Sequence, residues 1–345
     1  MTNILLLLLL TAVFLLPFIL KEAEEGMEYF LFGAGLLAVT ITACWSQKLI
    51  IETLLTPLKI TAAVIVCGII FEVFAGKIGP IVGRVSAKTG KPFFVLIMII
   101  ILGLFSSIFT AIISALILSE VMGHMNLPRK TEINIVILAC FAIGMGAVLT
   151  PVGEPLSTIV TEKLSVEPFN AGFLFLFREF WIYSSVIIIL LAAAGAIITA
   201  CGNGNDEGLK EDKRGGFKSI AMRGFKVYLF IAGLVLLGAG YTPFVKTYVS
   251  GLPHYMLYWI NMVSAVLDNA TLAAAEISPA MSLLQIKSAM LGLIISGGML
   301  IPGNIPNIIC AGKLGIKPKE WAKFAVPAGL IILCFSFIAV IFVHL

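Results

Sequence analysis

The chain has 345 residues, of which 60% are hydrophobic and only 12% are charged, and its formal net charge at pH 7 is +4. A soluble domain carries about 25% charged residues, so this composition excludes a soluble enzyme with an apolar core. No basic patch is interleaved with aromatic residues, which argues against a nucleic-acid partner. Apolar stretches of about 20 residues, long enough to span a bilayer, recur along the chain. They predict an all-α polytopic membrane protein whose surroundings are the lipid bilayer.

The first two apolar stretches, residues 4–20 and 29–45, predict two leading transmembrane helices within residues 1–58. Residues 4–20 have the length of a signal peptide as well. However, they lack a positively charged start, and no small-x-small cleavage site follows them. We therefore interpret this stretch as the first transmembrane helix.

The rest of the chain contains six further apolar stretches and two stretches that are polar in their middles. The six predict full spans at residues 59–76, 133–162, 181–201, 225–244, 282–311 and 323–343. The other two, residues 93–120 and 255–278, could each be a single crossing or a re-entrant hairpin. Their interrupting residues are Ser106, Ser107, Thr110 and Ser114 in the first, and Ser264, Asp268, Asn269, Thr271 and Glu276 in the second.

The distribution of Lys and Arg separates these alternatives, because cytoplasmic loops of membrane proteins are rich in basic residues. The basic connections here are residues 77–92, 119–132, 202–226 and 312–323. All four fall on one side only if both ambiguous stretches enter and leave by the same face. The pattern therefore favours two re-entrant hairpins and about eight full spans. It also predicts a plasma-membrane protein with residues 202–224 in the cytoplasm and the N-terminus outside.

The order of elements then repeats along the chain. A helix, a hairpin, a broken helix and a helix make up residues 59–201, and the same four elements make up residues 225–345. Each unit crosses the membrane three times, so the second unit is inverted relative to the first, as in many secondary transporters. Residues 202–224, which are polar, Gly-rich and basic, predict a solvated linker between the units.

Two segments place helix breakers inside apolar stretches. Their glycines Gly153 and Gly303 lie 150 positions apart, and a Lys-Leu pair follows each glycine ten residues later. Unpaired backbone in a bilayer is tolerated only where it lines a cavity, so a matched pair of breaks indicates the binding site of a transporter. The prolines expected to break the helices are Pro151, Pro155, Pro302 and Pro306.

The second hairpin concentrates polar groups at Asp268, Asn269 and Thr271. A carboxylate in hydrocarbon costs about 3 kcal/mol or more unless it is paired or solvated. A hard cation such as Na⁺ prefers carboxylate, carbonyl and amide oxygens. We therefore expect these residues to bind a cation. The alternative is that Asp268 only caps the second half-helix of the hairpin.

Glu154 follows Gly153, where the helix is expected to unwind, and it corresponds to Asn304 in the second unit. Desolvation favours a protonated carboxyl, and a nearby cation opposes protonation, so one such site can exchange protons for cations. The alternative is an interfacial Glu154 that faces water. The breaks also supply backbone carbonyls and neutral side-chain oxygens, from Thr150, Gly153, Ser157, Gly303, Asn304 and Asn307.

Neither cofactor binding nor enzymatic chemistry is expected. The three histidines are scattered, and the six cysteines form no CxxC pair, so no spacing suits a bound metal cluster. No catalytic dyad can be identified either.

These motifs resemble those of the ion transporter superfamily, which includes NhaD-type sodium/proton antiporters, arsenite permeases and divalent anion/sodium symporters. The resemblance lies in residues 264–271 and in the broken segments 150–155 and 301–307. Within the superfamily the chain is most similar to a predicted cation transporter family. The resemblance implies sodium binding at the hairpin tips, an elevator-like displacement and a homodimer. The first hairpin departs from the pattern, because it has no Asn or Asp at Thr110-Ala111.

The sequence therefore predicts a secondary active cation transporter, above all a sodium/proton antiporter that works by alternating access. Asp268, Asn269 and Glu154 would hold the sodium ion at the core of the site. The alternative is a sodium-coupled symporter of a small organic or inorganic anion. Because no arginine lies within a span, cation exchange is favoured over anion symport.

Overall fold

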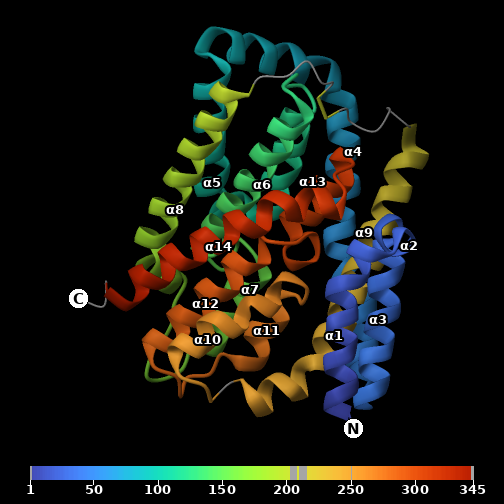
Figure 1. Cartoon of the computed structure of the whole chain (residues 1–345), viewed down its shortest axis with the longest axis vertical. Coiled ribbons are helices and arrows are strands. Elements are labelled where there is room, and N and C mark those ends of the chain that lie inside the picture. Colours follow the sequence, from blue (N-terminus) through green and yellow to red (C-terminus); the bar gives the residue numbers. More distant parts are fainter. Residues whose placement is uncertain (1, 203–207, 210–215, 250, 343–345) are drawn as a thin grey trace.

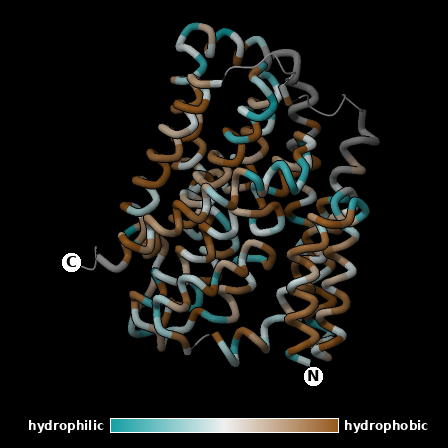
Figure 2. The backbone as a smooth tube through the Cα atoms, in the orientation of Figure 1, coloured by the Kyte–Doolittle hydropathy of each residue, from teal (hydrophilic) through white to brown (hydrophobic). Residues whose placement is uncertain are grey.

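The computed structural model of this chain describes residues 2–202, 208–209, 216–249 and 251–342. These residues form helices joined by turns, and they contain no strand. Seven of the helices are long and apolar enough to cross a membrane, by length and composition. This arrangement is the one expected of a polytopic membrane protein. Figure 2 shows hydrophobic residues along most helices and hydrophilic residues at the turns of one end.

One group of helices, which we call the outer bundle, lies on one side of the molecule (Figure 1). Within it, α3 and α4 both pack against α9. The approach of α3 to α9 is close because of small residues: a Cβ on Gly35 would lie 2.7 Å from the carbonyl oxygen of Gly233. The outer bundle comprises α1 (Thr2–Ile19), α2 (Lys21–Glu25), α3 (Met27–Thr42), α4 (Gln47–Thr89) and α9 (Gly216–Tyr248).

The remaining helices form the inner bundle, with α6 at its centre. Nearly every side chain of α6 is buried, as expected of a helix that is apolar all round. In its first part α6 packs against α5 and α8. This part comprises α5 (Lys91–Met122), α6 (Arg129–Ala147), α7 (Pro155–Lys163) and α8 (Phe175–Cys201). The second part comprises α10 (His254–Ile260), η1 (Asn261–Ala265), α11 (Asn269–Glu276), α12 (Leu283–Gly297), η2 (Ile301–Gly303), α13 (Ile305–Leu314) and α14 (Pro318–Phe342).

The helix α5 consists of two arms that meet at Thr110. This residue has φ 74° and ψ 150°, far from helical values. Nζ of Lys91, at the start of α5, donates a hydrogen bond of 2.9 Å to the carbonyl oxygen of Asn126, just beyond its end. A straight helix of 32 residues would separate its ends by about 48 Å. The chain therefore reverses direction within α5.

Several connections meet around the start of α6. Arg129 donates two hydrogen bonds to the carboxylate of Glu320 in α14 and one to the carbonyl oxygen of Gly315 in the turn before it. The carboxylate of Glu132 accepts hydrogen bonds from the backbone N–H groups of Leu127 and Leu209. Together with the contact of Lys91, these bonds gather the turns that follow α4, α5, α8 and α13 at one end of the molecule.

The helices extend beyond the ranges expected from hydropathy. Because α4 begins at Gln47 and ends at Thr89, the expected unit boundary at residue 59 lies inside a helix, and most of residues 77–92 is helical. Similarly, α9 begins at Gly216, inside the expected linker 202–224. Residues 203–207 and 210–215 of that linker lie outside the described residues. Hydropathy marks only the apolar part of a helix, while Lys and Arg are good helix formers that continue it.

The seven candidate spans differ from the eight spans predicted. Three apolar helices of 10–17 residues fall below the length of a full span, namely α3, α12 and α13. The last two are the halves of one broken helix. The helix α5 is counted once, although its two arms run in opposite directions. Length alone therefore does not describe how often this chain traverses the bundle.

Candidate functional site

The first break lies between Ala147, where α6 ends, and Pro155, where α7 begins. Only glycine fits at Gly153, because an added Cβ would collide with the carbonyl group of Ala147. The carbonyl oxygen of Gly153 accepts a hydrogen bond of 2.9 Å from the backbone N–H of Ala111. This bond ties the break to the point at which α5 reverses.

The second break has the same form. It separates the end of α12 at Gly297 from the start of α13 at Ile305. A Cβ on Gly303 would lie 2.5 Å from the carbonyl oxygen of Gly297 and 2.7 Å from that of Ser264. The backbone is extended at the residue before each second half-helix, with φ −157° at Glu154 and φ −151° at Asn304. The spacing of 150 residues seen in the sequence thus recurs in the geometry.

Two serine hydroxyls, one from α5 and one from η1, each bond to the neighbouring broken helix. Oγ of Ser106 donates to the carbonyl oxygen of Ile143 at 2.9 Å. Oγ of Ser264 donates to that of Leu293 at 2.8 Å. The two accepting carbonyls are again 150 positions apart. Both serines are fully buried, so both bonds lie inside the bundle.

Further side-chain donors satisfy carbonyls that the breaks release. Oγ of Ser157 donates to the carbonyl oxygen of Ala147 at 3.3 Å, and Nδ2 of Asn307 donates to that of Gly297 at 2.8 Å. Asn307 also bonds the carbonyl oxygen of Leu300 at 2.9 Å. These candidate ligands therefore use their donors to hold the breaks. Oδ1 of Asn307 has no partner among the described residues and remains an acceptor.

Thr150 also stabilises the first break. Its Oγ1 donates a hydrogen bond of 2.5 Å to the carbonyl oxygen of Ser107 in α5. The prolines Pro302 and Pro306 lie buried in the second break and at the start of α13. Their counterparts Pro151 and Pro155 line a cavity in the first break.

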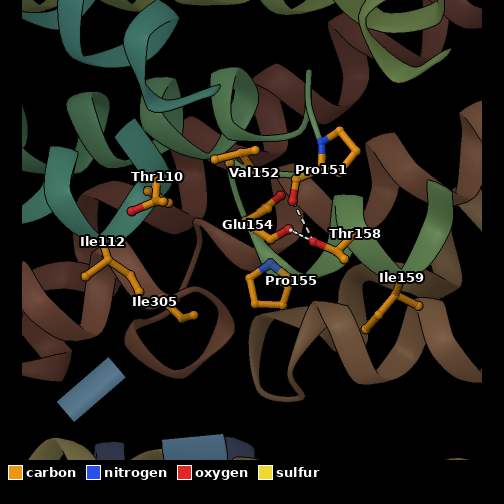
Figure 3. A pocket seen from close by; sticks show the side chains of 11 residues that line it. Thr110, Ile112, Pro151, Val152, Glu154, Pro155, Thr158, Ile159 and Ile305 are labelled. Carbon is orange, nitrogen blue, oxygen red and sulfur yellow. Dashed lines mark hydrogen bonds between the residues drawn. The ribbon is translucent and has the colours of Figure 1, made fainter. Parts of the chain in front are cut away.

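Glu154 lines this cavity, which has a volume of about 350 Å³ (Figure 3). The residue is only 6% exposed, and its side chain does not cap α7. Instead, Oγ1 of Thr158 holds the backbone by hydrogen bonds to the carbonyl oxygens of Pro151 and Glu154, at 2.6 and 3.3 Å. Oε1 of Glu154 is buried and has no hydrogen-bond partner in the described part of the chain. Glu154 is thus buried and available for a ligand.

Asp268 caps α11, as the capping alternative expected. Its Oδ2 accepts hydrogen bonds of 2.8 Å from both the backbone N–H and the Oγ1 of Thr271. The corresponding residue at the reversal of α5 is Thr110, whose Oγ1 accepts a hydrogen bond of 3.4 Å from the backbone N–H of Ile113. Capping uses one oxygen of Asp268, so it does not exclude a cation at the other.

Asp268 lines a second cavity, of about 530 Å³, between the two bundles. Thr271 of α11 lines it from the inner bundle, and residues of α4 and α9 line it from the outer bundle. Pro155, Ile159 and Ile305 line this cavity and also the cavity of Glu154. These three residues therefore form a wall that both cavities share. Glu154 and Asp268, which line the two cavities, are close enough for their charges to interact.

The remaining candidates lie beside this pair. Asn269 is buried, and its Nδ2 has no partner among the residues described. The amide of Asn304 reaches α6, because a Cβ on Gly144 would lie 2.9 Å from its Nδ2. The structure thus gathers the predicted residues around α6, the two breaks and the second hairpin. Within the described ranges, no group of three His, Cys, Asp or Glu side chains could hold a metal ion.

Sequence reasoning missed Glu120, at the end of α5. It left open whether Glu276, at the end of α11, lines the same path as Asp268 or lies at the outer surface. Both carboxylates are buried. The available signal was the Lys-Leu pair that follows each break, since Lys163 and Lys313 reach toward these two helix ends.

A family model described as "Protein of unknown function (DUF1646)" matches residues 2–343 of the chain. No curated protein matches the chain.

Proposed function

The chain belongs to the DUF1646 family of proteins of unknown function, and we propose that it is a secondary active cation transporter, above all a sodium/proton antiporter. The observation that supports this proposal most strongly is the environment of Glu154. Its carboxylate is buried at a helix break, one of its oxygens has no partner among the described residues, and it is close enough to Asp268 for their charges to interact. Two buried carboxylates that share one region are unfavourable when both are charged. Protons or a cation relieve this cost in alternation, which is the physical basis of exchange.

The recurring geometry supports two inverted repeats. In this proposal, α4, the two arms of α5, the broken helix α6–α7 and α8 form the first repeat. The second consists of α9, the hairpin α10–α11, the broken helix α12–α13 and α14. The break glycines, and the carbonyls that accept the serine hydrogen bonds, are each 150 positions apart, which supports this equivalence. The first hairpin starts at the end of the molecule where α6 begins, whereas the second starts at the opposite end (Figure 1).

The two bundles suit an elevator-like mechanism. The inner bundle carries both breaks and both hairpins, and the outer bundle would serve as the scaffold, shared in a homodimer. The cavity of Asp268 is lined by both bundles, so a displacement of one against the other would change its access to water. In this proposal the basic end around α6 faces the cytoplasm of a plasma-membrane protein, and the N-terminus lies outside.

The proposal is tested in everted membrane vesicles with a dye that reports the proton gradient. Addition of Na⁺ should dequench the dye, and Asp268→Asn should abolish the response. Glu52→Gln is the matched control, because Glu52 lines the same cavity but its side chain is 51% exposed. Full activity of Asp268→Asn would contradict the assignment. Anion-stimulated Na⁺ uptake without proton counterflow would favour the symporter instead.

A further inference from the structure

Two lysines at a spacing of 150 residues occupy equivalent positions. Lys163 lies in the last turn of α7, and Lys313 lies in the last turn of α13. Each side chain crosses to a hairpin arm of the other half of the chain. Lys163 reaches the end of α11, and Lys313 reaches the end of α5. In each case a glutamate stands at that helix end, Glu276 or Glu120.

In one of these places the charges pair directly. Nζ of Lys313 lies 2.5 Å from Oε2 of Glu120. The side chains are 10% and 3% exposed, respectively. In a buried ion pair of this kind, the charge of each group compensates the charge of the other.

In the other place the lysine bonds the backbone instead. Nζ of Lys163 donates to the carbonyl oxygens of Ala274 and Ile277, the latter at 2.9 Å. These carbonyls lie at the C-terminal end of α11, which a cation stabilises. Lys163 is still near enough to Glu276 for their charges to interact. The ammonium group of Lys163 therefore has two kinds of acceptor nearby, the backbone carbonyls and the carboxylate of Glu276, and it bonds only the carbonyls.

Glu276 is consequently buried without a hydrogen-bond partner. It is 1% exposed, and neither of its carboxylate oxygens has a partner within the described ranges. Asn261 of η1 approaches it, but Nδ2 of that residue donates to the carbonyl oxygen of Ala289 at 3.3 Å. The charged groups on this side are Lys163 of α7 and, near it, Lys246 of α9. An ionised carboxylate is costly in such a place, and a bound proton removes the cost.

We propose that Glu276 is a proton-binding site separate from the Glu154–Asp268 pair. When its carboxyl group gives a proton to water, the resulting carboxylate pairs with the ammonium group of Lys163. Lys163 then leaves the carbonyls of α11, and the contact takes the form seen between Lys313 and Glu120. The arrangement thus links the protonation of Glu276 to a bond between α7 and the second hairpin. Its contribution to transport rests on the proposed antiport.

Infrared difference spectroscopy of the purified full-length protein tests the site without transport. The spectrum at acidic pH minus that at alkaline pH should contain the C=O band of a protonated, weakly hydrogen-bonded carboxyl group. This band should disappear in Glu276→Gln. It should remain in the matched control Glu120→Gln, because the carboxylate of Glu120 is paired with Lys313. An unchanged set of bands in Glu276→Gln would overturn the proposal.

A second variant guards against a folding defect in the first. Lys163→Met removes the positive charge beside Glu276, so the titration midpoint of the same band should move to higher pH by about one unit. A midpoint that does not move would contradict the link between Lys163 and Glu276. Thermal melting in detergent identifies any variant that fails to fold.

Transport then separates this inference from the proposed function. In proteoliposomes, the reversal potential gives the number of protons exchanged per cation, and Glu276→Gln should lower this number while exchange continues. If the wild type shows no exchange but the band titrates, the antiporter proposal fails and the site stands. If exchange is present and Glu276→Gln changes neither the band nor the proton number, the site fails alone.

Discussion

The two halves of this molecule share their glycine breaks and serine hydrogen bonds but differ in where their charged residues lie. In the first half, Thr110 lies where α5 reverses and Glu154 lies at the break. At the corresponding places of the second half stand Asp268 and Asn304. At these two places, each half therefore has one carboxylate, which lies at the break in the first half and at the N-cap of α11 in the second.

This difference separates what holds the fold from what gives it chemistry. The glycines at the breaks, and the serines that bond Ile143 and Leu293, occur in both halves. They satisfy requirements of backbone geometry that each half must meet. Backbone geometry does not require a charge at the hairpin and break positions, so the two halves can carry different residues there. The lysine contacts follow the same rule, since Lys313 forms an ion pair and Lys163 does not bond its glutamate.

The largest effect is expected from the carboxylate of the first break. Glu154→Gln keeps the size of the side chain and removes its charge, so Na⁺-driven proton movement should fall to background, a loss of about 100-fold or more. Asn304→Gln, at the corresponding place of the second half, should retain measurable exchange. The two variants are compared by dye dequenching in everted vesicles at equal expression. Equal losses in both would show that the break geometry, and not the charge, is decisive.

The glycines of the breaks should be equally important in both halves. Gly153→Ala and Gly303→Ala each place a Cβ against a backbone carbonyl, so each should lower stability by about 3 kcal/mol. Gly312→Ala is the control, because a Cβ at Gly312 meets nothing within 4 Å, and alanine favours a helix. Melting temperatures in detergent provide the measurement. A tolerated alanine at only one break would mean that the two breaks are not equivalent.

Glycine substitutions at Thr110, where α5 reverses, and at Asp268, the N-cap of α11, should change stability in opposite directions. Thr110 has a positive φ of 74°, which glycine adopts without strain, so Thr110→Gly should raise stability by about 1 kcal/mol. Asp268 has φ −59° and caps α11, so Asp268→Gly should lower stability by a few tenths of a kcal/mol or more. Thermal melting of both variants measures the signs. If both substitutions changed the melting temperature in the same direction, the proposed difference between the two positions would be wrong.

The smallest effects are expected from the paired serines. Ser106→Ala and Ser264→Ala each remove one buried hydrogen bond to a carbonyl oxygen, and each should cost about 1 kcal/mol. Ser184→Ala serves as the control, because Oγ of this buried serine has no hydrogen-bond partner among the described residues. Costs that differ by more than the cost of one hydrogen bond would contradict the equivalence of the two contacts.

Local sequence patterns determined much of this picture. Apolar stretches predicted the helices, because burial in lipid depends on composition over a short window. Breaker residues predicted the two interruptions, and the spacing between Gly153 and Gly303 predicted their correspondence. The same patterns singled out Glu154 and Asp268. They placed the boundary at residue 59 inside α4, because hydropathy does not record where a helix continues into polar sequence.

Only the tertiary structure decided how these groups are used. It assigned the donors of Thr150, Ser157 and Asn307 to carbonyls, and it placed Glu154 and Asp268 in two cavities that share a wall. It also paired Lys313 with Glu120 and turned Lys163 toward the backbone of α11. Lys313 and Glu120 lie far apart in the chain, as do Lys163 and the end of α11, so their distances depend on how the two halves pack. No window of sequence contains both members of such a pair, and for that reason their pairing could not be predicted.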